Sequence, residues 1–390
     1  MEIITKTSEL ENYCSHAKEF DFITVDTEFL RESTYWPILC LIQAATSERA
    51  VIIDPLANGL DLTPFFDLLA DKNIVKVFHA ARQDIEIFVK LTGNVPISTF
   101  DTQIAASVCG FGDSISYDNL VRSIVGEQID KSSRFTDWSA RPLSAKQLNY
   151  ALADVTHLRD IYSHLTKKIQ ENDRSSWVED ENQILTNIDT YVIQPENAWK
   201  RMRMKVNRPR DFAAMKLLAQ WREQRAQDKN IPRGRVLKDD AILELAVQRP
   251  IRSERFDKLR AVPRGFSRSS ASSEIIKLIK QVEQLDNDQL PKLPKRKNGP
   301  SPKGPVGDLL RVLLKAVCER EGVAPKILAS SSDIDEIVLD DNADVPALKG
   351  WRRKVFGEKA LAIKNGTIGL GATSKGIVEI PFTQPPQDEK

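Results

Sequence analysis

The sequence predicts an α/β domain with a mixed sheet, followed by all-helical segments. Two observations on this 390-residue chain support that fold class. In roughly the first 170 residues, apolar runs of strand length alternate with runs that have helical spacing. From about residue 175 to 285, apolar residues recur only at helical spacing, and Pro232, Pro250 and Pro263 separate short helices. The length suits two or three domains.

The first predicted strands are three apolar runs near the N-terminus, separated by short connections. They are FDFITVDTEF (20–29), ILCLIQAATS (38–47) and RAVIIDP (49–55). Runs of this length that are rich in Val, Ile and Thr are typical of strands, and short connections favour antiparallel neighbours. We therefore expect an antiparallel meander at the start of the sheet.

A helix, a strand and a second helix are expected next. Thr63–Ala70 has helical spacing, Ile74–Ala80 is an apolar run of strand length, and Arg82–Lys90 has helical spacing and is followed by Gly93. After about residue 100 the pattern is mostly helical, up to a long run that ends near residue 171. The predicted strands are thus confined to about the first hundred residues.

Charge is distributed unevenly along the chain, although the net charge is only +1. Residues 1–199 contain 17 Lys and Arg against 30 Asp and Glu, a net charge of −13. Residues 200–300 contain 26 against 12, a net charge of +14. Acids gathered in a site can hold cations, whereas a basic module attracts polyanions. The alternative, surface charge without a function, explains a single run better than it explains this asymmetry.

Several classes of protein are excluded by composition. No apolar run reaches the roughly 18 residues of a membrane span, and the acidic, polar N-terminus does not resemble a secretory signal. The four cysteines are scattered and form no CxxC pair, which disfavours a disulfide framework or a zinc site. We therefore expect a cytoplasmic protein.

Two acids stand at the end of the first predicted strand. Asp26 and Glu28 are two residues apart, so the alternation of a strand places both carboxylates on one face. Two like charges side by side destabilise the fold unless a positive charge lies between them. This pair therefore predicts a cation site.

Two further acids and a tyrosine occur where they can join that pair. Asp84 lies just past a predicted strand, at the start of a helix, where an acid also stabilises the helix dipole. Tyr150 and Asp154 are four residues apart on an apolar helix and so share one face. Four carboxylates suit Mg²⁺ or Mn²⁺, which prefer oxygen ligands. Two such ions about 4 Å apart can bracket a phosphodiester, and Tyr150 could orient the attacking water.

The order of these motifs resembles the DEDD exonuclease superfamily in its tyrosine-bearing branch. The matching stretches are DTEF (26–29), HAARQD (79–84) and YALAD (150–154). The longer stretch DTEFLRESTYWPILCLIQ (26–43), together with FDTQIAA (100–106), is similar to the ribonuclease D family, and the similarity covers the whole chain. The resemblance implies a ribonuclease H-like fold and 3′→5′ hydrolysis of RNA to nucleoside 5′-monophosphates.

The resemblance also implies roles for the residues and partners. Asp26, Glu28, Asp84 and Asp154 would hold the two divalent ions and, with Tyr150, form the catalytic set. Asp26 would bridge both ions, and Glu28 and Asp154 would hold the ion that carries the nucleophile. The expected substrates are tRNA precursors and other small structured RNAs, and nothing requires more than a monomer.

The basic middle of the chain resembles the HRDC module, a small helical bundle implicated in nucleic-acid binding. The features are Trp221 and Arg222 on a long helix, Asn230 and Pro232 in the centre, and the helix that starts at Asp240–Leu243. Trp221 has core spacing rather than that of a base-stacking platform. The stretch WRRKVFGEKALAI (351–363) is similar to the closing helix of a second, degenerate repeat. For this repeat, packing against the exonuclease domain or the first repeat is at least as good a role as binding RNA.

The expected boundaries follow from these resemblances. They are residues 1–172 for the exonuclease domain, 173–207 for a helical connector, 208–288 for the first HRDC domain, 289–305 for a linker rich in proline and lysine, 306–376 for the degenerate HRDC-like domain and 377–390 for a tail.

Three residues are candidates for substrate contact, each with a structural alternative. Phe29 could wedge against terminal bases or pack in the core. Gln43 is polar on a central strand and must find a partner, which could be a substrate sugar or the backbone. His79 could contact the terminal nucleotide, although a structural role is the simpler interpretation.

Two further features near the predicted site point less specifically to a function. Asp101 is expected to cap a helix rather than bind metal. Arg134 and Trp138 lie in a polar loop before the Tyr150 helix, which could guide the RNA strand.

Two other functions remain open from the sequence. The same catalytic motifs serve 3′→5′ exonucleases that act on DNA, although this chain has neither a polymerase segment nor a GxxxxGK[ST] loop. A non-catalytic nucleic-acid-binding protein on the same fold would be expected to have lost one of the acids, and all four are present.

Overall fold

The computed structural model describes residues 1–203, 206–293 and 304–382. It divides into two compact units. The first contains Met1–Thr27, Leu41–Asn187 and the C-terminal residues from 304 on, and the second contains Glu28–Cys40 with the residues from Ile188 to 293. In the described ranges, no helix is both long and apolar enough to cross a membrane.

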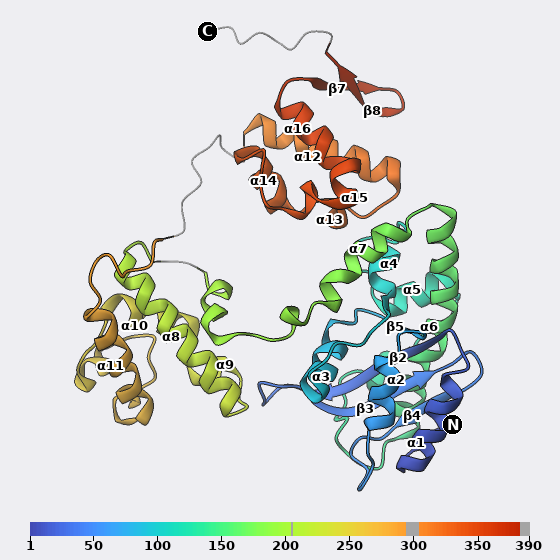
Figure 1. Cartoon of the computed structure of the whole chain (residues 1–390), viewed down its shortest axis with the longest axis horizontal. Coiled ribbons are helices and arrows are strands. Elements are labelled where there is room, and N and C mark those ends of the chain that lie inside the picture. The colour runs from blue at the N-terminus through green and yellow to red at the C-terminus, as the bar shows by residue number, and fades with distance from the viewer. Residues whose placement is uncertain (204–205, 294–303, 383–390) are drawn as a thin grey trace. The chain divides into compact units, whose positions relative to one another are not determined.

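A six-stranded mixed sheet forms the centre of the N-terminal part (Figure 1). In spatial order the strands are β1 (Glu2–Ile4), β4 (Ala50–Ile53), β3 (Ile38–Ala45), β2 (Phe22–Leu30), β5 (Val75–Phe78) and β6 (Thr99–Asp101). Strands β3 and β4 are antiparallel, whereas β1 pairs with β4, β2 with β5, and β5 with β6 in parallel. The four strands expected from the sequence are present. The three-residue strands β1 and β6 were not predicted, because they are too short to show a period.

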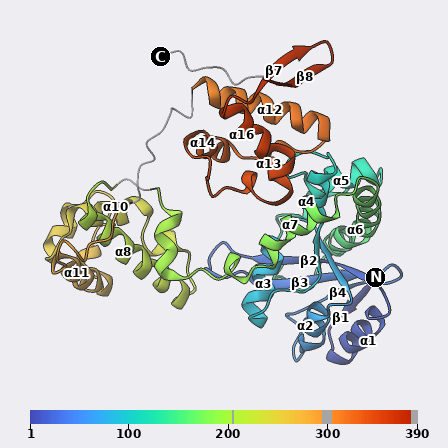
Figure 2. The same cartoon turned by 45° about the horizontal axis from the view of Figure 1, so that its top comes forward.

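Helices cover both faces of this sheet (Figure 2). On one side lie α1 (Thr7–Ala17), α2 (Thr63–Ala70) and α3 (Arg82–Thr92), and on the other lie α4 (Thr102–Val108), α5 (Tyr117–Ile124) and α6 (Ala145–Glu171). The Phe88 ring of α3 packs against Phe65 of α2 and Phe78 of β5. Helix α6 begins with a capping box in which Ser144 and Gln147 each bind the other's backbone N–H. The sheet is therefore buried on both faces, which explains its apolar strands.

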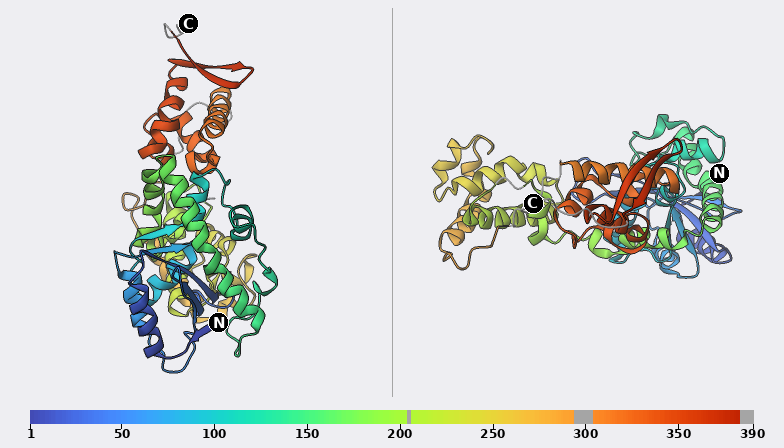
Figure 3. Two further views of the ribbon diagram at one scale, coloured as in Figure 1. Left: turned by 90° about the vertical axis from the view of Figure 1, so that its right-hand side faces the viewer. Right: turned by 90° about the horizontal axis from the view of Figure 1, so that it is seen from above.

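The C-terminal part of the first unit is helical but ends in a β-hairpin. Its helices are α12 (Pro305–Glu321), α13 (Pro325–Leu328), α14 (Ser331–Leu339), α15 (Gly350–Arg352) and α16 (Glu358–Lys364), and its strands are β7 (Ile368–Thr373) and β8 (Gly376–Pro381). The hairpin extends beyond the helices (Figure 3). The expectation that this part is all-helical was wrong for the hairpin, which spans residues 368–381. Gly376, at φ 117, allows a tight turn after which Ile377, Val378 and Ile380 pair with β7. Residues 383–390 of the expected tail, like 294–303 of the expected linker, lie outside the described residues.

This C-terminal part packs on helices of the N-terminal part. The ring of Trp177, on α7 (Ser175–Thr186), stacks on that of Trp351 with centroids 4.1 Å apart and an interplanar angle of 8°. Arg174 donates to the carbonyl of Val108 at 2.8 Å and to that of Glu321 at 2.5 Å. Buried side chains of both parts form one continuous apolar cluster. The C-terminal part therefore shares a core with the sheet domain.

The second unit is a helical bundle with its own core. It contains α8 (Pro209–Asp228), α9 (Arg233–Val236), α10 (Asp239–Gln248) and α11 (Ser270–Glu283), preceded by a 3₁₀ turn at Pro195–Arg201. Trp221 packs against the core, and its Nε1 donates to Glu274 at 2.7 Å. The segment Glu28–Cys40 belongs to this unit. There the Tyr35 hydroxyl donates to the buried carboxylate of Glu223 at 2.5 Å.

We expect Trp351→Ala to lower the free energy of unfolding of the full chain by about 3–5 kcal/mol, because it removes a buried, stacked indole and leaves a cavity. Chemical denaturation followed by circular dichroism measures this. Phe382→Ala, which truncates a half-exposed ring next to β8, serves as the control and should cost less than about 1 kcal/mol. Equal losses in the two variants would contradict the shared core.

Candidate active site

Strand β2 places two acids on one face in the middle of the sheet. Its side chains alternate, so Thr24, Asp26 and Glu28 point to the side of α6, whereas Val25 and Thr27 point to the other side. The strand lies between β3 and β5, and both acids are partly buried. The predicted pair is therefore held on a rigid central element.

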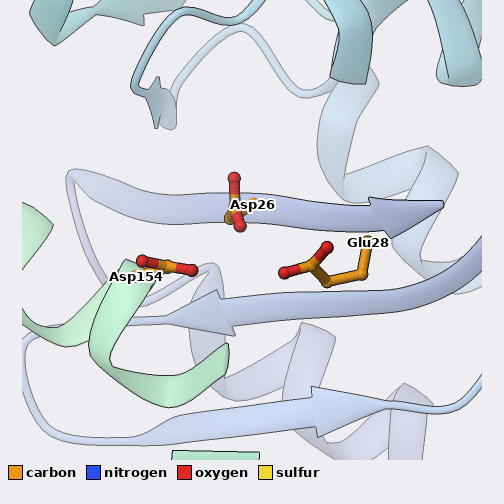
Figure 4. Close-up of side chains that lie close together, drawn as sticks. All are labelled: Asp26, Glu28 and Asp154. Atoms are coloured by element: carbon orange, nitrogen blue, oxygen red, sulfur yellow. The ribbon is translucent and has the colours of Figure 1, made fainter. Parts of the chain in front are cut away.

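Helix α6 brings a third acid to the pair. The Thr24 hydroxyl donates to the carbonyl of Val155 at 2.8 Å, which fixes α6 against β2 beside Asp154. Each of Asp26, Glu28 and Asp154 offers a carboxylate oxygen such that the three atoms lie within 4.8 Å of one another. Figure 4 shows the three side chains converging from β2 and α6. The structure thus brings together three of the four predicted acids, although 128 residues separate the first from the last.

Burial and mutual repulsion disfavour the charged forms of these acids. Burial, followed by the charge of Asp154, raises the pKa of Asp26 well above its usual value. Burial also raises the pKa of Asp154 to about 7, although a hydrogen bond from Tyr150 and the positive charge of Arg134 oppose that rise. A bound cation would reverse this balance, because it favours the ionised carboxylates.

The fourth predicted acid, Asp84, lies outside this group of three. It is in the first turn of α3, where its carboxylate accepts a hydrogen bond of 2.5 Å from the Thr27 hydroxyl. It is buried, and burial together with the charge of Asp26 raises its pKa. Asp84 is therefore close enough to Asp26 to feel its charge, and the hydroxyl of Thr27, the residue after Asp26, holds its carboxylate.

Asp101 positions the start of the helix that carries Asp84. Its carboxylate accepts from the backbone N–H groups of Ala80 at 3.0 Å, Ala81 at 2.9 Å and Gln103 at 2.7 Å. Ala80 has φ 58, a left-handed conformation that costs free energy in a residue other than glycine. The predicted cap on α4 is confirmed, and the same carboxylate also stabilises the turn before α3.

The donor set fits hard divalent cations. Among the described residues, the cluster that could hold an ion offers carboxylate oxygens alone, with no imidazole or thiolate. Mg²⁺ and Mn²⁺ bind such oxygens, whereas structural zinc prefers nitrogen and sulfur. All four cysteines are free and buried. The residues present therefore match the predicted metal class.

Tyr150 lies on α6 one turn before Asp154 and hydrogen-bonds to its carboxylate. The ring of Trp138 packs beside that of Tyr150 with centroids 6.1 Å apart, and Trp138 is only 2% exposed. Tyr117, which the sequence did not point to, donates its hydroxyl to the carbonyl of Ala153 at 2.9 Å. Burial and the charges of Asp154 and Asp26 raise the pKa of Tyr117, which places a second phenol near the acids.

The three candidate substrate contacts differ in exposure and in hydrogen bonding. Phe29 is partly exposed next to Glu28. Gln43 is fully buried, and neither atom of its amide has a hydrogen-bond partner in the described part of the chain. His79 has its Nδ1 3.0 Å from the hydroxyl of Thr102 and its Nε2 3.1 Å from the carbonyl of Ile115. These contacts favour the structural interpretation of His79.

Comparison with known protein families places these residues in a nuclease context. The 3′-5′ exonuclease family profile matches residues 1–170, and the HRDC domain profile matches residues 211–279. The acids of β2, α3 and α6 therefore lie within the exonuclease match. A single HRDC match is found, in the second unit.

Comparison with individual proteins extends the similarity over the whole chain. The ribonuclease D of Nitrobacter hamburgensis is 47% identical over 380 residues, which cover 97% of this chain and 99% of that protein. The ribonuclease D of Bartonella henselae is 47% identical over 95% of this chain and 91% of its own. The crystal structure of Escherichia coli RNase D, described as an exoribonuclease involved in structured RNA processing, superposes with a TM-score of 0.82 at 28% identity. That match covers 93% of this chain and 98% of the other.

We expect Asp154→Asn to make the metal-free protein more stable than the wild type at pH 8, by about 4 kcal/mol at most. Burial raises the pKa of Asp154 in the folded protein to about 7, whereas the pKa of an unfolded Asp is about 4. Between these pH values the folded protein keeps a proton on Asp154 that the unfolded chain has lost. Unfolding free energy therefore falls as pH rises from about 4 to 7, and the variant lacks this fall.

Chemical denaturation of both proteins in EDTA between pH 5 and 8 measures the difference. Asp67→Asn, which replaces an exposed acid on α2, is the control. Added Mn²⁺ should stabilise the wild type more than Asp154→Asn. If the difference in unfolding free energy between wild type and Asp154→Asn did not change with pH, the raised pKa of Asp154 would not be its cause.

Proposed function

This chain belongs to the ribonuclease D family, and we propose that it is a 3′→5′ exoribonuclease that releases nucleoside 5′-monophosphates. The observation that carries the proposal is the convergence of Asp26, Glu28 and Asp154 from β2 and α6 within the region that matches the exonuclease profile. The hydrogen bond between Tyr150 and Asp154 supports the tyrosine-bearing variant of the site.

Two divalent ions, Mg²⁺ or Mn²⁺, are part of this proposal. When bound, they lower the pKa of an attacking water and neutralise charge on the leaving 3′ oxygen. Asp26, Glu28 and Asp154 would hold one ion, and Asp26 with Asp84 would hold the other. The Tyr150 hydroxyl would orient the water, because its hydrogen bond to Asp154 places it beside the first of these ligand groups. Thr24 and Thr27 keep α6 and Asp84 in place on β2.

The helical bundle of the second unit would hold RNA by sequence-independent contacts. Three of its arginines serve the fold, since Arg222, Arg225 and Arg249 form ion pairs with Asp239, Glu274 and Asp211 respectively. Seven others are exposed and form no ion pair with a described residue: Arg233, Arg235, Arg252, Arg255, Arg260, Arg264 and Arg268. Exposed arginines of this kind contact phosphates and attract a polyanion.

We propose tRNA precursors and other small structured RNAs as substrates, a monomeric state and a cytoplasmic location, where four free cysteines stay reduced. We also propose that residues 306–376 are a degenerate HRDC-like domain, which is supported by its helices α12 to α16. Its shared core with the exonuclease domain indicates that its main role is packing.

A 3′-extended tRNA precursor labelled at its 5′ end provides the direct test. We expect a ladder that shortens from the 3′ end with Mg²⁺ or Mn²⁺ and no products in EDTA, with single-stranded DNA of the same length cut more slowly. Internal cuts would contradict the proposal, and faster degradation of the DNA would favour a DNA exonuclease of the same superfamily.

Two substitutions separate the roles within the site. Asp26→Asn should remove several orders of magnitude of activity, because Asp26 serves both ions. Tyr150→Phe should lower kcat by about 10²-fold, since the ions still activate the water. Single-turnover rates measure both variants, and circular dichroism checks that both are folded. A larger loss in Tyr150→Phe than in Asp26→Asn would overturn this assignment.

Replacing Arg255, Arg260 and Arg264 together by Gln should weaken RNA binding by the inactive Asp26→Asn protein. The slope of log K against log salt should fall by about 2, because each phosphate contact to a single strand contributes about 0.7. Fluorescence anisotropy with labelled RNA at several salt concentrations measures the slope. Arg225→Gln, which breaks an internal ion pair, is the control, and an unchanged slope in the triple variant would exclude these three contacts.

A further inference from the structure

The loop between α5 and α6 exposes a phenylalanine that has no role in the core. Phe135 is 90% exposed, more than any other large apolar side chain in the described residues. Single exposed apolar residues are common on protein surfaces and need no explanation by themselves. The surroundings of Phe135 distinguish it from such residues.

The neighbouring side chain is an arginine that lies over the exposed ring. The guanidinium carbon of Arg134 is 5.3 Å from the centroid of the Phe135 ring. Arg134 is itself exposed and forms no ion pair with any residue that the structure describes. The same loop continues to Trp138, whose ring packs beside that of Tyr150, one turn before Asp154 on α6. An aromatic ring and an available arginine therefore stand together near the acidic cluster.

The loop beneath these two side chains is fixed on both sides. Before them, Lys131 forms an ion pair with Asp118 at 2.6 Å. After them, the Thr136 hydroxyl donates to the carbonyl of Ser133 at 2.8 Å and accepts from the Gln147 amide at 3.2 Å. The side chains of Arg134 and Phe135 are thus presented from an ordered backbone.

The far end of the loop is anchored against the site and the sheet domain. Trp138 is buried beside Tyr150, and Arg141 donates to both carboxylate oxygens of Asp54 at 2.7 Å. A bidentate arginine–carboxylate pair restrains orientation as well as distance. Presenting two binding side chains on a fixed loop lowers the entropic cost of binding a ligand.

We propose that Phe135 and Arg134 form a nucleotide subsite on the 5′ side of the scissile phosphodiester, in which Phe135 stacks on a base and Arg134 contacts the adjacent phosphate. The inference rests on the proposed function, because it needs an RNA strand whose 3′ end reaches the acids. Phe135 is 90% exposed on the loop that packs Trp138 against Tyr150, so an RNA strand whose 3′ end reaches the acids would meet Phe135 beyond its terminal nucleotide.

The chemistry of the pair fits a single strand of any sequence. Every base has a face that stacks on an aromatic ring, and arginine matches the geometry of a phosphate. The positive charge of Arg134 also offsets the repulsion that a polyanion meets as it approaches the carboxylates. The subsite would thus bring the strand to the site without reading its sequence.

Steady-state kinetics of the full chain with two substrates tests the aromatic half of the subsite. One substrate is a single-stranded RNA 12-mer, and the other is the p-nitrophenyl ester of thymidine 5′-monophosphate, which has no strand beyond the reacting nucleotide. Phe135→Ala should raise KM for the RNA by about 10-fold and leave kcat/KM for the ester unchanged. Phe135→Trp should restore the KM, and Phe135→Leu should not.

The salt dependence of kcat/KM tests the role of Arg134. Arg134→Gln should flatten the slope of log(kcat/KM) for the RNA against log salt by about 0.7, the value expected for one phosphate contact, whereas Arg134→Lys should keep most of the slope. Phe382→Ala, a substitution of another exposed phenylalanine, should change neither substrate's kinetics and is the control.

Two results would contradict the proposed subsite. One is an unchanged KM for the RNA in Phe135→Ala, and the other is an equal loss on RNA and ester, which would indicate a disturbed catalytic centre. A wild-type protein that hydrolyses the ester but does not shorten RNA would instead refute the proposed function, so the two failures are distinguishable.

Discussion

Repulsion between carboxylates on strand β2 and the elements around it is the constraint on which the site depends. Asp26, Glu28 and Asp154 converge although burial and like charge disfavour their ionised forms. Two threonines of the same strand hold the arrangement. Thr24 binds the backbone of α6 beside Asp154, and Thr27 binds the carboxylate of Asp84. The strand thus supplies two of the acids and positions the other two.

The structure separates arginines that stabilise the helical bundle from arginines that can bind a polyanion. Arg222 is 2% exposed and pairs with Asp239, so its charge serves the fold. Arg233 and Arg235, and the arginines from Arg252 to Arg268, are exposed and form no ion pair among the described residues. Not all of the net charge of +14 over residues 200–300 is therefore available to bind RNA, because some of the arginines pair with acids inside the bundle.

Packing gives the C-terminal helices a role that does not require contact with RNA. The stack of Trp177 on Trp351 and the hydrogen bonds of Arg174 join them to α4 and α7. Arg352 forms an ion pair with Glu181, whose carboxylate is buried. Of the two roles left open for this region, packing against the exonuclease domain has direct structural support.

The sequence by itself determined the elements and the identity of the acids, because both are local properties of the chain. A period of two puts Asp26 and Glu28 on one face of β2, and a period of 3.6 puts Tyr150 and Asp154 on one face of α6. Asp101 was likewise predictable as a cap, since its position before a helix decides its hydrogen bonds. The β7–β8 hairpin was missed, because its glycines and exposed apolar residues blur the alternation of a strand.

Only the tertiary structure decided which side chains meet. It joined Asp154 to the pair on β2 and bound Asp84 to the hydroxyl of Thr27. It also buried the amide of Gln43 with no partner among the described residues, and placed both ring nitrogens of His79 within hydrogen-bond distance of Thr102 and Ile115. These outcomes depend on how β2, α3 and α6 pack across more than a hundred residues of sequence. No local pattern encodes that packing, because it arises from burying the two faces of one sheet under different helices.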